Sequence, residues 1–424
     1  MTLTEQGYRP RLIDDTINKY LGLFGALSLE GPKWCGKTWT ALNHANSALY
    51  ILDPENSYAN REAARLNPAV ILSGKEKPLL VDEWQEVPGI WDAVRFAADR
   101  TKEKGLYILT GSVTPQKGSY VHSGAGRIGK IRMRTMSLYE SGNSSGIVSL
   151  NGLFNGDKID NAISGLTQKE LIDLCLRGGW PENIDVKTED AGILPEQYKI
   201  ALAGTDITSV DNRRRNPGLV LHLLAAVART NMTPALLNTI VADVQARFGN
   251  ISRQTVSEYL SALIRLYVIE EIPQWFPELR DKLRLRKAPK RMLADPSIAV
   301  SALNARPDDL ARDPRTLGGI FENLCLRDLL VYCEASGGKL SHYHDTSGLE
   351  VDAIIEWSNK WAGMEIKMGM HRIEDGAVVL KRLRDKLVAK GAAPPAFLGV
   401  ITGGGSLFTR DDGVLVIPID CLKN

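Results

Sequence analysis

A glycine-rich segment near the N-terminus has the residue types that surround a phosphate chain. It reads Gly31-Pro32-Lys33-Trp34-Cys35-Gly36-Lys37-Thr38 and lies between the apolar run 26–30 and a helix-forming stretch that begins with Trp39. The spacing GxxxxGK[ST] between a strand and a helix lets backbone N–H groups and the helix N-terminus face the phosphates. We therefore predict that residues 31–39 bind ATP, with Lys37 at its terminal phosphates and the Thr38 hydroxyl on Mg²⁺.

Two adjacent carboxylates end the next buried strand. Residues 78–83 read Pro-Leu-Leu-Val-Asp-Glu, so an apolar run is followed directly by Asp82 and Glu83. Asp82 can hold Mg²⁺ through water, and Glu83 can act as the general base that polarises the attacking water. The two motifs together indicate nucleotide hydrolysis, whereas each one alone also occurs as a glycine-rich turn or an acidic strand end.

Two hydroxyl residues and an arginine extend this set. Thr110 and Ser112 end the apolar run that begins at Leu106, where they could sense the γ-phosphate or orient the water. Ordinary turn chemistry beside a glycine explains them equally well. Arg127 could stabilise transition-state charge in cis or across a subunit contact, which would imply a homo-oligomer. The alternative for Arg127 is a solvated surface position.

A second set of carboxylates lies in the last third of the chain. Residues 348–356 and 363–367 read as two strands of a hairpin, in which Asp352, Glu365 and Lys367 share one face. Two carboxylates can hold Mg²⁺, and a lysine can activate water or neutralise a phosphate. The pattern is weak by itself, because acids and lysines alternate on many exposed hairpins.

The middle of the chain is helical in its pattern and ends in a basic run. Residues 252–260 begin with an N-cap serine and place small polar residues on one face, like the recognition helix of a winged helix-turn-helix. Seven basic residues follow against one acid, namely Arg280, Lys282, Arg284, Arg286, Lys287, Lys290 and Arg291. The run around Arg284 predicts contact with the phosphate backbone of DNA. A nucleotide-responsive lid with a solvated basic face is the alternative.

The bulk composition narrows the class of protein. A chain of 424 residues is expected to hold two or three domains. The 52 Lys and Arg against 50 Asp and Glu leave a net charge of +2, which provides no argument for a polyanionic partner. Five cysteines without CxxC spacing favour neither a disulfide framework nor a zinc site. No apolar run is long enough to span a membrane, so we expect an untargeted cytoplasmic protein.

The motifs GPKWCGKT, PLLVDEW and YILTGS occur together in one known family. In their order and spacing the chain resembles a family of bacterial and archaeal AAA-type ATPases fused to a C-terminal domain of unknown function. Residues 177–182, RGGWPE, resemble that family's Gly-Gly-aromatic-Pro element. The resemblance implies an α/β fold with a P-loop AAA-type ATPase core, a helical and winged-helix middle and a C-terminal domain like PD-(D/E)XK restriction endonucleases. It also implies that Glu322 is that domain's helix acid and binds metal with Asp352 and Glu365.

Three parts and two competing functions follow. We expect the ATPase core in residues 1–160, the helical and winged-helix region in 161–300 and the nuclease-like domain in 301–424. In the first hypothesis ATP hydrolysis moves the winged helix and the nuclease-like domain on DNA. In the second the protein is an ATP-driven switch or protein-interaction module whose nuclease-like domain is catalytically silent. Stimulation of ATP hydrolysis by DNA is expected only under the first.

Overall fold

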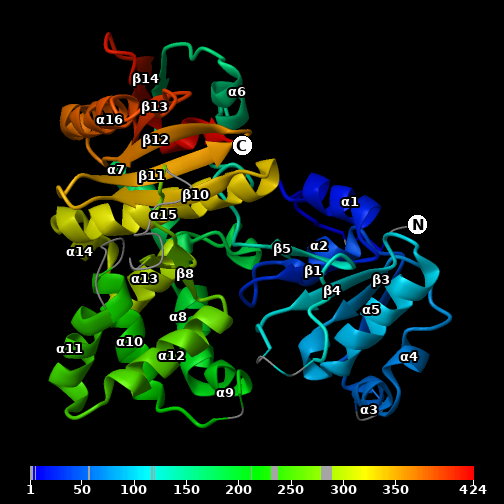
Figure 1. Ribbon diagram of the computed structural model, residues 1–424. Helices are drawn as coiled ribbons and strands as arrows, with labels where there is room; N and C mark the ends of the chain where they lie inside the picture. The colour runs from blue at the N-terminus through cyan, green and yellow to red at the C-terminus, as the bar shows by residue number, and fades with distance from the viewer. Residues whose placement is uncertain are drawn as a thin grey trace. The chain divides into compact units, whose positions relative to one another are not determined.

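The computed structural model describes residues 3, 4, 6–55, 58–115, 118, 120–211, 213–230, 237–277 and 289–424. They form two compact units, each composed of three separate segments of the chain (Figure 1). Unit 1 comprises Met1–Thr135, Thr205–Arg214 and Ala262–Tyr267, and unit 2 comprises Met136–Gly204, Arg215–Ser261 and Val268–Asn424. The three predicted ranges are contiguous in sequence, whereas these units are not.

Unit 1 is built around a parallel five-stranded sheet in the order β2-β3-β4-β1-β5. Its strands are β1 (Ala26–Glu30), β2 (Ser47–Tyr50), β3 (Leu79–Asp82), β4 (Tyr107–Gly111) and β5 (Ile128–Arg132). Nearly every residue of the three interior strands β1, β3 and β4 is buried. A parallel sheet covered on both faces needs consecutive apolar residues, which explains the short uninterrupted runs in the sequence.

The helices of unit 1 cover both faces of this sheet. They include α1 (Asp14–Leu23), α2 (Lys37–Leu42), α3 (Ala59–Leu66), α4 (Pro68–Ile71) and α5 (Gly89–Thr101). Leu79 and Val81 of β3 join one core with Trp84 and Trp91, whereas Leu80 between them joins the other core. This alternation is the two-residue period of a strand. The carboxyl ends of β1, β3 and β4 therefore meet at one edge of a firmly packed sheet.

Unit 2 begins with a helical part. Its helices include α6 (Leu150–Asn155), α7 (Gln168–Arg177), α8 (Ile193–Ala201), α10 (Pro217–Arg229), α11 (Leu237–Phe248), α13 (Pro296–Leu303) and α14 (Pro307–Arg312). Helix α12 (Arg253–Arg265) precedes two antiparallel strands, β8 (Ile269–Ile272) and β9 (Lys290–Leu293). Of the predicted basic run, Arg280, Lys282, Arg284, Arg286 and Lys287 lie outside the described residues. The structure thus describes only Lys290 and Arg291 of that run.

The rest of unit 2 is a mixed seven-stranded sheet in the order β10-β11-β12-β13-β15-β14-β7. Its strands are β10 (Lys339–His344), β11 (Glu350–Trp357), β12 (Lys360–Ile366), β13 (Leu398–Thr402), β14 (Gly405–Thr409), β15 (Leu415–Pro418) and β7 (Ala162–Ser164). Figure 1 shows its β10–β13 part between α15 (Pro314–Ser336) and α16 (Ile373–Val388). The predicted hairpin is present, because β11 and β12 pair antiparallel with Ala353 opposite Met364.

Segments that are distant in sequence complete unit 2. Strand β7 pairs with β14, and β6 (Val148–Ser149) pairs with β16 (Leu422–Lys423).

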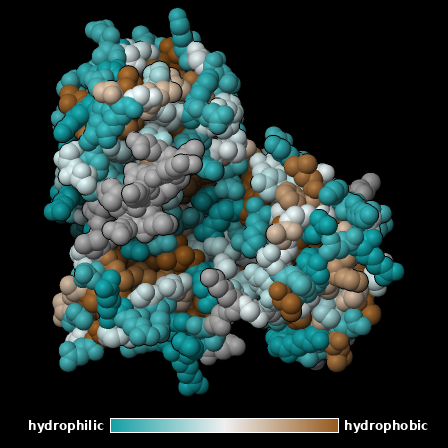
Figure 2. Space-filling model, in the orientation of Figure 1, coloured by the Kyte–Doolittle hydropathy of each residue, from teal (hydrophilic) through white to brown (hydrophobic). Residues whose placement is uncertain are grey.

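Hydrophilic residues cover most of the face drawn in Figure 2, between smaller apolar areas. Over the described part of the chain, no helix is both long enough and apolar enough to cross a membrane.

Candidate nucleotide site and a second carboxylate cluster

The glycine-rich segment follows β1 and leads directly into α2. Gly36 is the N-cap of α2 and has φ 96°, a conformation that glycine adopts at no steric cost. A Cβ at Gly31 would lie 2.2 Å from the Met133 carbonyl oxygen, so only glycine allows the loop to pass this close to the chain after β5. The loop conformation therefore depends on both glycines of the motif.

Lys37 and Thr38 are the first two residues of α2. The buried Lys37 ammonium donates to the Pro32 carbonyl oxygen at 2.7 Å, which places the charge inside the loop. The Thr38 hydroxyl donates to Asp82 Oδ1 at 2.8 Å. The structure thus brings the loop and the carboxyl end of β3 together, as the two motifs predict.

Asp82 accepts hydrogen bonds from two hydroxyl groups on different elements. Its Oδ1 also accepts from Thr110 Oγ1 at 2.6 Å, at the end of β4. Burial raises the pKa of Asp82, while the hydrogen bonds from Thr110 and Thr38 act in the opposite direction. A carboxylate beside a hydroxyl is the all-oxygen donor set that Mg²⁺ prefers, so these residues fit that ion.

Glu83 is held in a conformation that is uncommon for a residue with a side chain. Its φ is 54°, in the left-handed region, and such strain is found mostly where the surrounding structure requires it. Its Oε2 accepts a hydrogen bond from Ser112 Oγ at 2.9 Å and another from Gln85 Nε2. The strand end and two neutral donors thus fix the position of this carboxylate.

The other predicted residues of this site have different surroundings. Trp34 and Trp39 are among the exposed large side chains. Lys33 pairs with Asp206 at 2.7 Å within unit 1. Arg127 donates to Asp99 and precedes β5, where its carbonyl oxygen accepts from the backbone N–H of Ala26 at 3.1 Å. It therefore lies at the amino end of β1, opposite the phosphate loop, so the structure does not bring Arg127 to the site in cis.

Sequence reasoning missed a buried arginine that supports the loop. Arg11 donates from Nη1 to the Cys35 carbonyl oxygen and from Nη2 to the Arg134 carbonyl oxygen, each at 2.9 Å. Cys35 itself is buried and packs in the core on that face of the sheet. Arg11 precedes α1 without any motif, so only the folded chain identifies its role.

A tyrosine after α12 reaches the end of β1 within unit 1. The Tyr267 hydroxyl donates to Glu30 Oε2 at 3.1 Å and accepts from Thr114 Oγ1 at 2.8 Å. The Arg132 guanidinium lies 3.8 Å from the centre of its ring. Burial, followed by the nearby negative charge of Glu30, raises the pKa of Tyr267, which keeps this hydroxyl protonated. These contacts tie the chain after α12 to the residue that precedes Gly31.

The second carboxylate cluster forms in unit 2. Lys367 Nζ lies 2.5 Å from Glu365 Oε2 and 3.5 Å from Asp352 Oδ2. The backbone N–H of Asp352 donates to Glu365 Oε1 at 3.2 Å, and the backbone N–H of Ile366 donates to Asp352 Oδ2 at 2.9 Å. The predicted group Asp352, Glu365 and Lys367 is therefore assembled on the β11–β12 hairpin.

Glu322 and an unpredicted lysine complete the cluster. Glu322 projects from α15, and Lys290 of β9 lies 3.6 Å from Glu322 Oε1, 2.8 Å from Glu350 Oε1 and 3.6 Å from Asp352 Oδ1. The Lys290 side chain is 1% exposed. The basic run predicts Lys290 at a DNA-facing surface, and this prediction is wrong, because the Lys290 side chain points inward. Its neighbour Arg291 pairs with Glu271 at 3.0 Å.

The electrostatics of the cluster differ from residue to residue. Burial raises the pKa of Glu322 and of Glu365, and the charge of Asp352 adds to this in both cases. Burial also acts to raise the pKa of Asp352, but the charges of Lys367 and Lys290 outweigh it and the net shift is downward. Among the described residues, no group of three or more His, Cys, Asp or Glu side chains is arranged to hold a metal ion. The prediction that Glu322, Asp352 and Glu365 form a metal site is therefore not supported, and these carboxylates face the ammonium groups of Lys290 and Lys367 instead.

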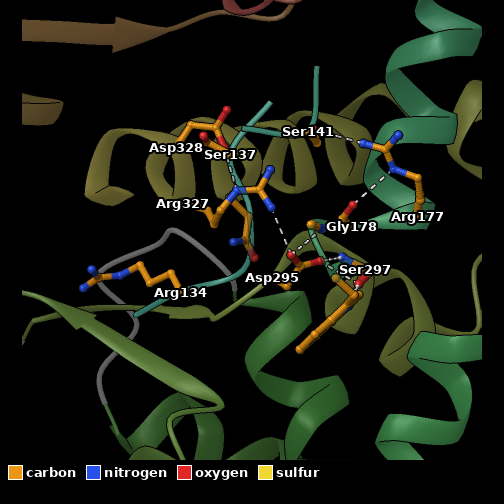
Figure 3. Close-up of polar contacts among 12 residues, drawn as sticks. Arg134, Ser137, Ser141, Arg177, Gly178, Asp295, Ser297, Arg327 and Asp328 are labelled. Atoms are coloured by element: carbon orange, nitrogen blue, oxygen red, sulfur yellow. Dashed lines mark hydrogen bonds and ion pairs between the residues drawn. The ribbon is translucent and has the colours of Figure 1, made fainter. Parts of the chain in front are cut away.

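The RGGWPE element has a structural explanation. Arg327 and Asp328 of α15 and Asp295 before α13 form a buried charged network, in which Arg327 pairs with Asp295 at 3.0 Å and with Asp328 at 2.6 Å (Figure 3). Asp295 also accepts from the Gly179 backbone N–H at 2.9 Å. A Cβ at Gly179 would lie 2.1 Å from the Met136 carbonyl oxygen. The paired glycines therefore permit close backbone packing around the network.

Three family models match separate parts of the chain. Residues 24–142 match the AAA domain, residues 168–309 a domain of unknown function (DUF8612) and residues 317–422 a domain of unknown function (DUF4143). The resemblance to AAA-type P-loop ATPases is thereby confirmed for residues 24–142. The winged-helix and nuclease-like parts of the predicted fold stay predictions.

Two relatives come from mycobacteria. The uncharacterized proteins Rv2008c of Mycobacterium tuberculosis and Mb2031c of Mycobacterium bovis are each 24% identical over 402 residues, which cover 92% of this chain and 79% of the relative. Among solved structures, the Walker-type ATPase PABY2304 of Pyrococcus abyssi is 15% identical with a TM-score of 0.44, over 71% of this chain and 97% of that one. AMPPCP-bound DnaA from Aquifex aeolicus is 14% identical with a TM-score of 0.28, over 61% and 89%. At these TM-scores neither structure bears on fold or function.

Proposed function

We propose that unit 1 binds and hydrolyses ATP with Mg²⁺, and that the phosphate loop 31–38, Asp82 and Glu83 do this chemistry. The observation that carries the proposal is the convergence of the Thr38 and Thr110 hydroxyls on Asp82 Oδ1, near the Lys37 ammonium and the fixed Glu83. A metal-binding carboxylate beside a residue that positions water recurs in nucleotide hydrolases.

Each residue has a distinct role in this proposal. The backbone N–H groups of the loop and the N-terminus of α2 orient the phosphates, and Lys37 neutralises the terminal ones. Thr38 and Asp82 hold Mg²⁺, which when bound supplies positive charge against the phosphate oxygens. Glu83 orients water and accepts its proton, while Ser112 and Gln85 keep its carboxylate in place. Thr110 positions Asp82.

Calorimetry on Lys37→Ala tests the binding site. The variant should lose most of its ATP affinity, because the loop then lacks the ammonium that faces the phosphates. Lys130→Ala is a matched control, since Lys130 lies on β5 and pairs with Glu30 at 3.1 Å, outside the phosphate loop. Unchanged ATP affinity in Lys37→Ala would remove the basis of the proposal.

DNA association is a more specific function than ATP hydrolysis, and two observations bear on it. The order of three helices followed by an antiparallel strand pair supports a winged helix in residues 217–293. However, both described members of the basic run, Lys290 and Arg291, are paired with acids and so are occupied within the protein. We therefore favour the ATP-driven switch over the DNA-associated ATPase. An ATPase rate that rises with duplex or single-stranded DNA and falls again with salt would reverse this preference.

Nuclease activity of unit 2 stays a prediction. The grouping of Asp352, Glu365, Lys367 and Glu322 supports it, whereas the ammonium groups inside the cluster count against a bound metal ion. Incubation of the full chain with DNA and Mg²⁺ or Mn²⁺ tests it directly. Cleavage that disappears in Asp352→Ala would assign the activity to this cluster, and cleavage that persists would assign it elsewhere.

A further inference from the structure

Lys290 occupies a position that its surroundings in the sequence do not suggest. It belongs to a run of basic residues, yet its side chain is 1% exposed and its neighbour Arg291 is directed to Glu271 instead. A fully buried lysine is usually found where acidic partners compensate the loss of hydration. The partners of the Lys290 side chain therefore indicate its structural role.

The Lys290 ammonium faces three carboxylates that come from two elements. Glu350 and Asp352 lie on β11, and Glu322 lies on α15, with nitrogen–oxygen distances between 2.8 and 3.6 Å. Glu322 Oε1 is buried and makes no hydrogen bond. One positive charge thus occupies the point toward which three acidic side chains converge.

A divalent cation does not fit this arrangement as it stands. Mg²⁺ binds oxygens at about 2.1 Å in a near-octahedral shell and tolerates little distortion. A cation shared by the Glu322, Glu350 and Asp352 oxygens would lie next to the Lys290 ammonium, and the two positive charges would repel each other in a poorly hydrated site. The other Asp352 oxygen already accepts from the Ile366 backbone N–H and faces Lys367.

We propose that the Lys290 ammonium takes the place of a divalent cation in the Glu322–Glu350–Asp352 cluster, so that these carboxylates bind such an ion only when the ammonium is absent. This goes beyond ATP hydrolysis, which uses other residues. Two ammonium groups, on Lys290 and Lys367, supply the positive charge that a metal ion supplies in metal-dependent sites. The C-terminal cluster is thereby a structural ion-pair centre that joins β9, α15 and the β11–β12 hairpin.

Binding of Mn²⁺ alone, without nucleotide, tests the proposal. Stoichiometry is measured on the full chain by electron paramagnetic resonance in wild type, Lys290→Met, the double variant Lys290→Met/Asp352→Asn and the control Arg291→Met. Any Mn²⁺ held by unit 1 is common to all four proteins and cancels. Lys290→Met should gain one Mn²⁺ per chain over wild type and Arg291→Met, and the double variant should lose it. A folded Lys290→Met that gains no Asp352-dependent Mn²⁺ would overturn the proposal.

Stability gives a second readout. Lys290→Met leaves uncompensated carboxylates, so it should unfold roughly 5 °C or more below Arg291→Met, and Mn²⁺ should restore part of this difference. Should Lys290→Met not fold, wild type and Asp352→Asn decide the question. Equal Mn²⁺ binding by these two proteins supports the proposal, because the lysine then excludes the ion. Lower binding by Asp352→Asn contradicts it.

Discussion

The two carboxylate groups of this protein are held in opposite ways. Among the described residues, the side chains that hydrogen-bond Asp82 and Glu83 are neutral, namely Thr38, Thr110, Ser112 and Gln85. Asp352 and Glu365 face the ammonium of Lys367, and Asp352 also faces that of Lys290. Neutral donors orient a carboxylate and leave its charge available, whereas ammonium groups orient it and cancel the charge. The difference separates a site prepared for a cation from one that already contains its cations.

The largest effect that tests this comparison is expected at Glu83. Glu83→Gln keeps the shape of the side chain but cannot accept a proton, so ATP hydrolysis should fall about 100-fold or more while ATP binding is retained. Single-turnover rates and calorimetry measure the two quantities. Glu86→Gln is the control, because Glu86 lies in the short helix (Trp84–Glu86) that directly follows Glu83 and should leave the rate unchanged. Normal turnover in Glu83→Gln would mean that another residue accepts the proton.

Removal of an ammonium group from the second cluster should mainly affect stability. Lys367→Met leaves Asp352 and Glu365 facing each other without their shared partner, which should cost about 3–5 kcal/mol of the free energy of unfolding. Lys381→Met is the control, since Lys381 pairs with Asp412 near the surface and Asp412 keeps Arg410. That change should cost about 1 kcal/mol or less. Urea denaturation followed by circular dichroism measures both, and equal losses would contradict the charge-balance argument.

Removal of a neutral donor from the first group should cost less than removal of the ammonium. Thr110→Val preserves volume but deletes the hydroxyl on Asp82 Oδ1, which keeps Thr38. We expect a loss of about 1–3 kcal/mol in unfolding free energy, together with a higher Mg²⁺ concentration for half-maximal hydrolysis. Thr101→Val at the exposed end of α5 is the control. A loss as large as that of Lys367→Met would contradict the expectation that a neutral donor costs less to remove than an ammonium group.

The smallest effect is expected when the second cluster is changed and ATP hydrolysis is measured. Asp352→Asn alters a group that belongs to a different sheet and makes no contribution to the phosphate loop. The rate of hydrolysis should therefore remain within about twofold of wild type, whereas Asp82→Asn should lower it strongly. A change of tenfold or more in Asp352→Asn would indicate that the two units are energetically coupled.

The resemblance of residues 24–142 to an AAA domain was readable from local sequence. The spacing of Gly31, Gly36, Lys37 and Thr38 acts within one loop, and Asp82 follows a strand whose apolar run is unmistakable. On the β11–β12 hairpin, the equal parity of Asp352, Glu365 and Lys367 placed them on one face because side chains of a strand alternate with a period of two. These features depend on neighbours along the chain, so a motif suffices to predict them.

Other features were decided only by the tertiary structure. Arg127 lies at the amino end of its strand because the register of β5 against β1 places it there, and Arg11 supports the loop from a segment without any motif. Lys290 points inward, where three acids from α15 and β11 compensate its charge. Strand β7 joins β14 across more than half of the sequence. Pairing and burial between distant segments depend on the whole folded chain, and composition or periodicity of one segment cannot contain that information.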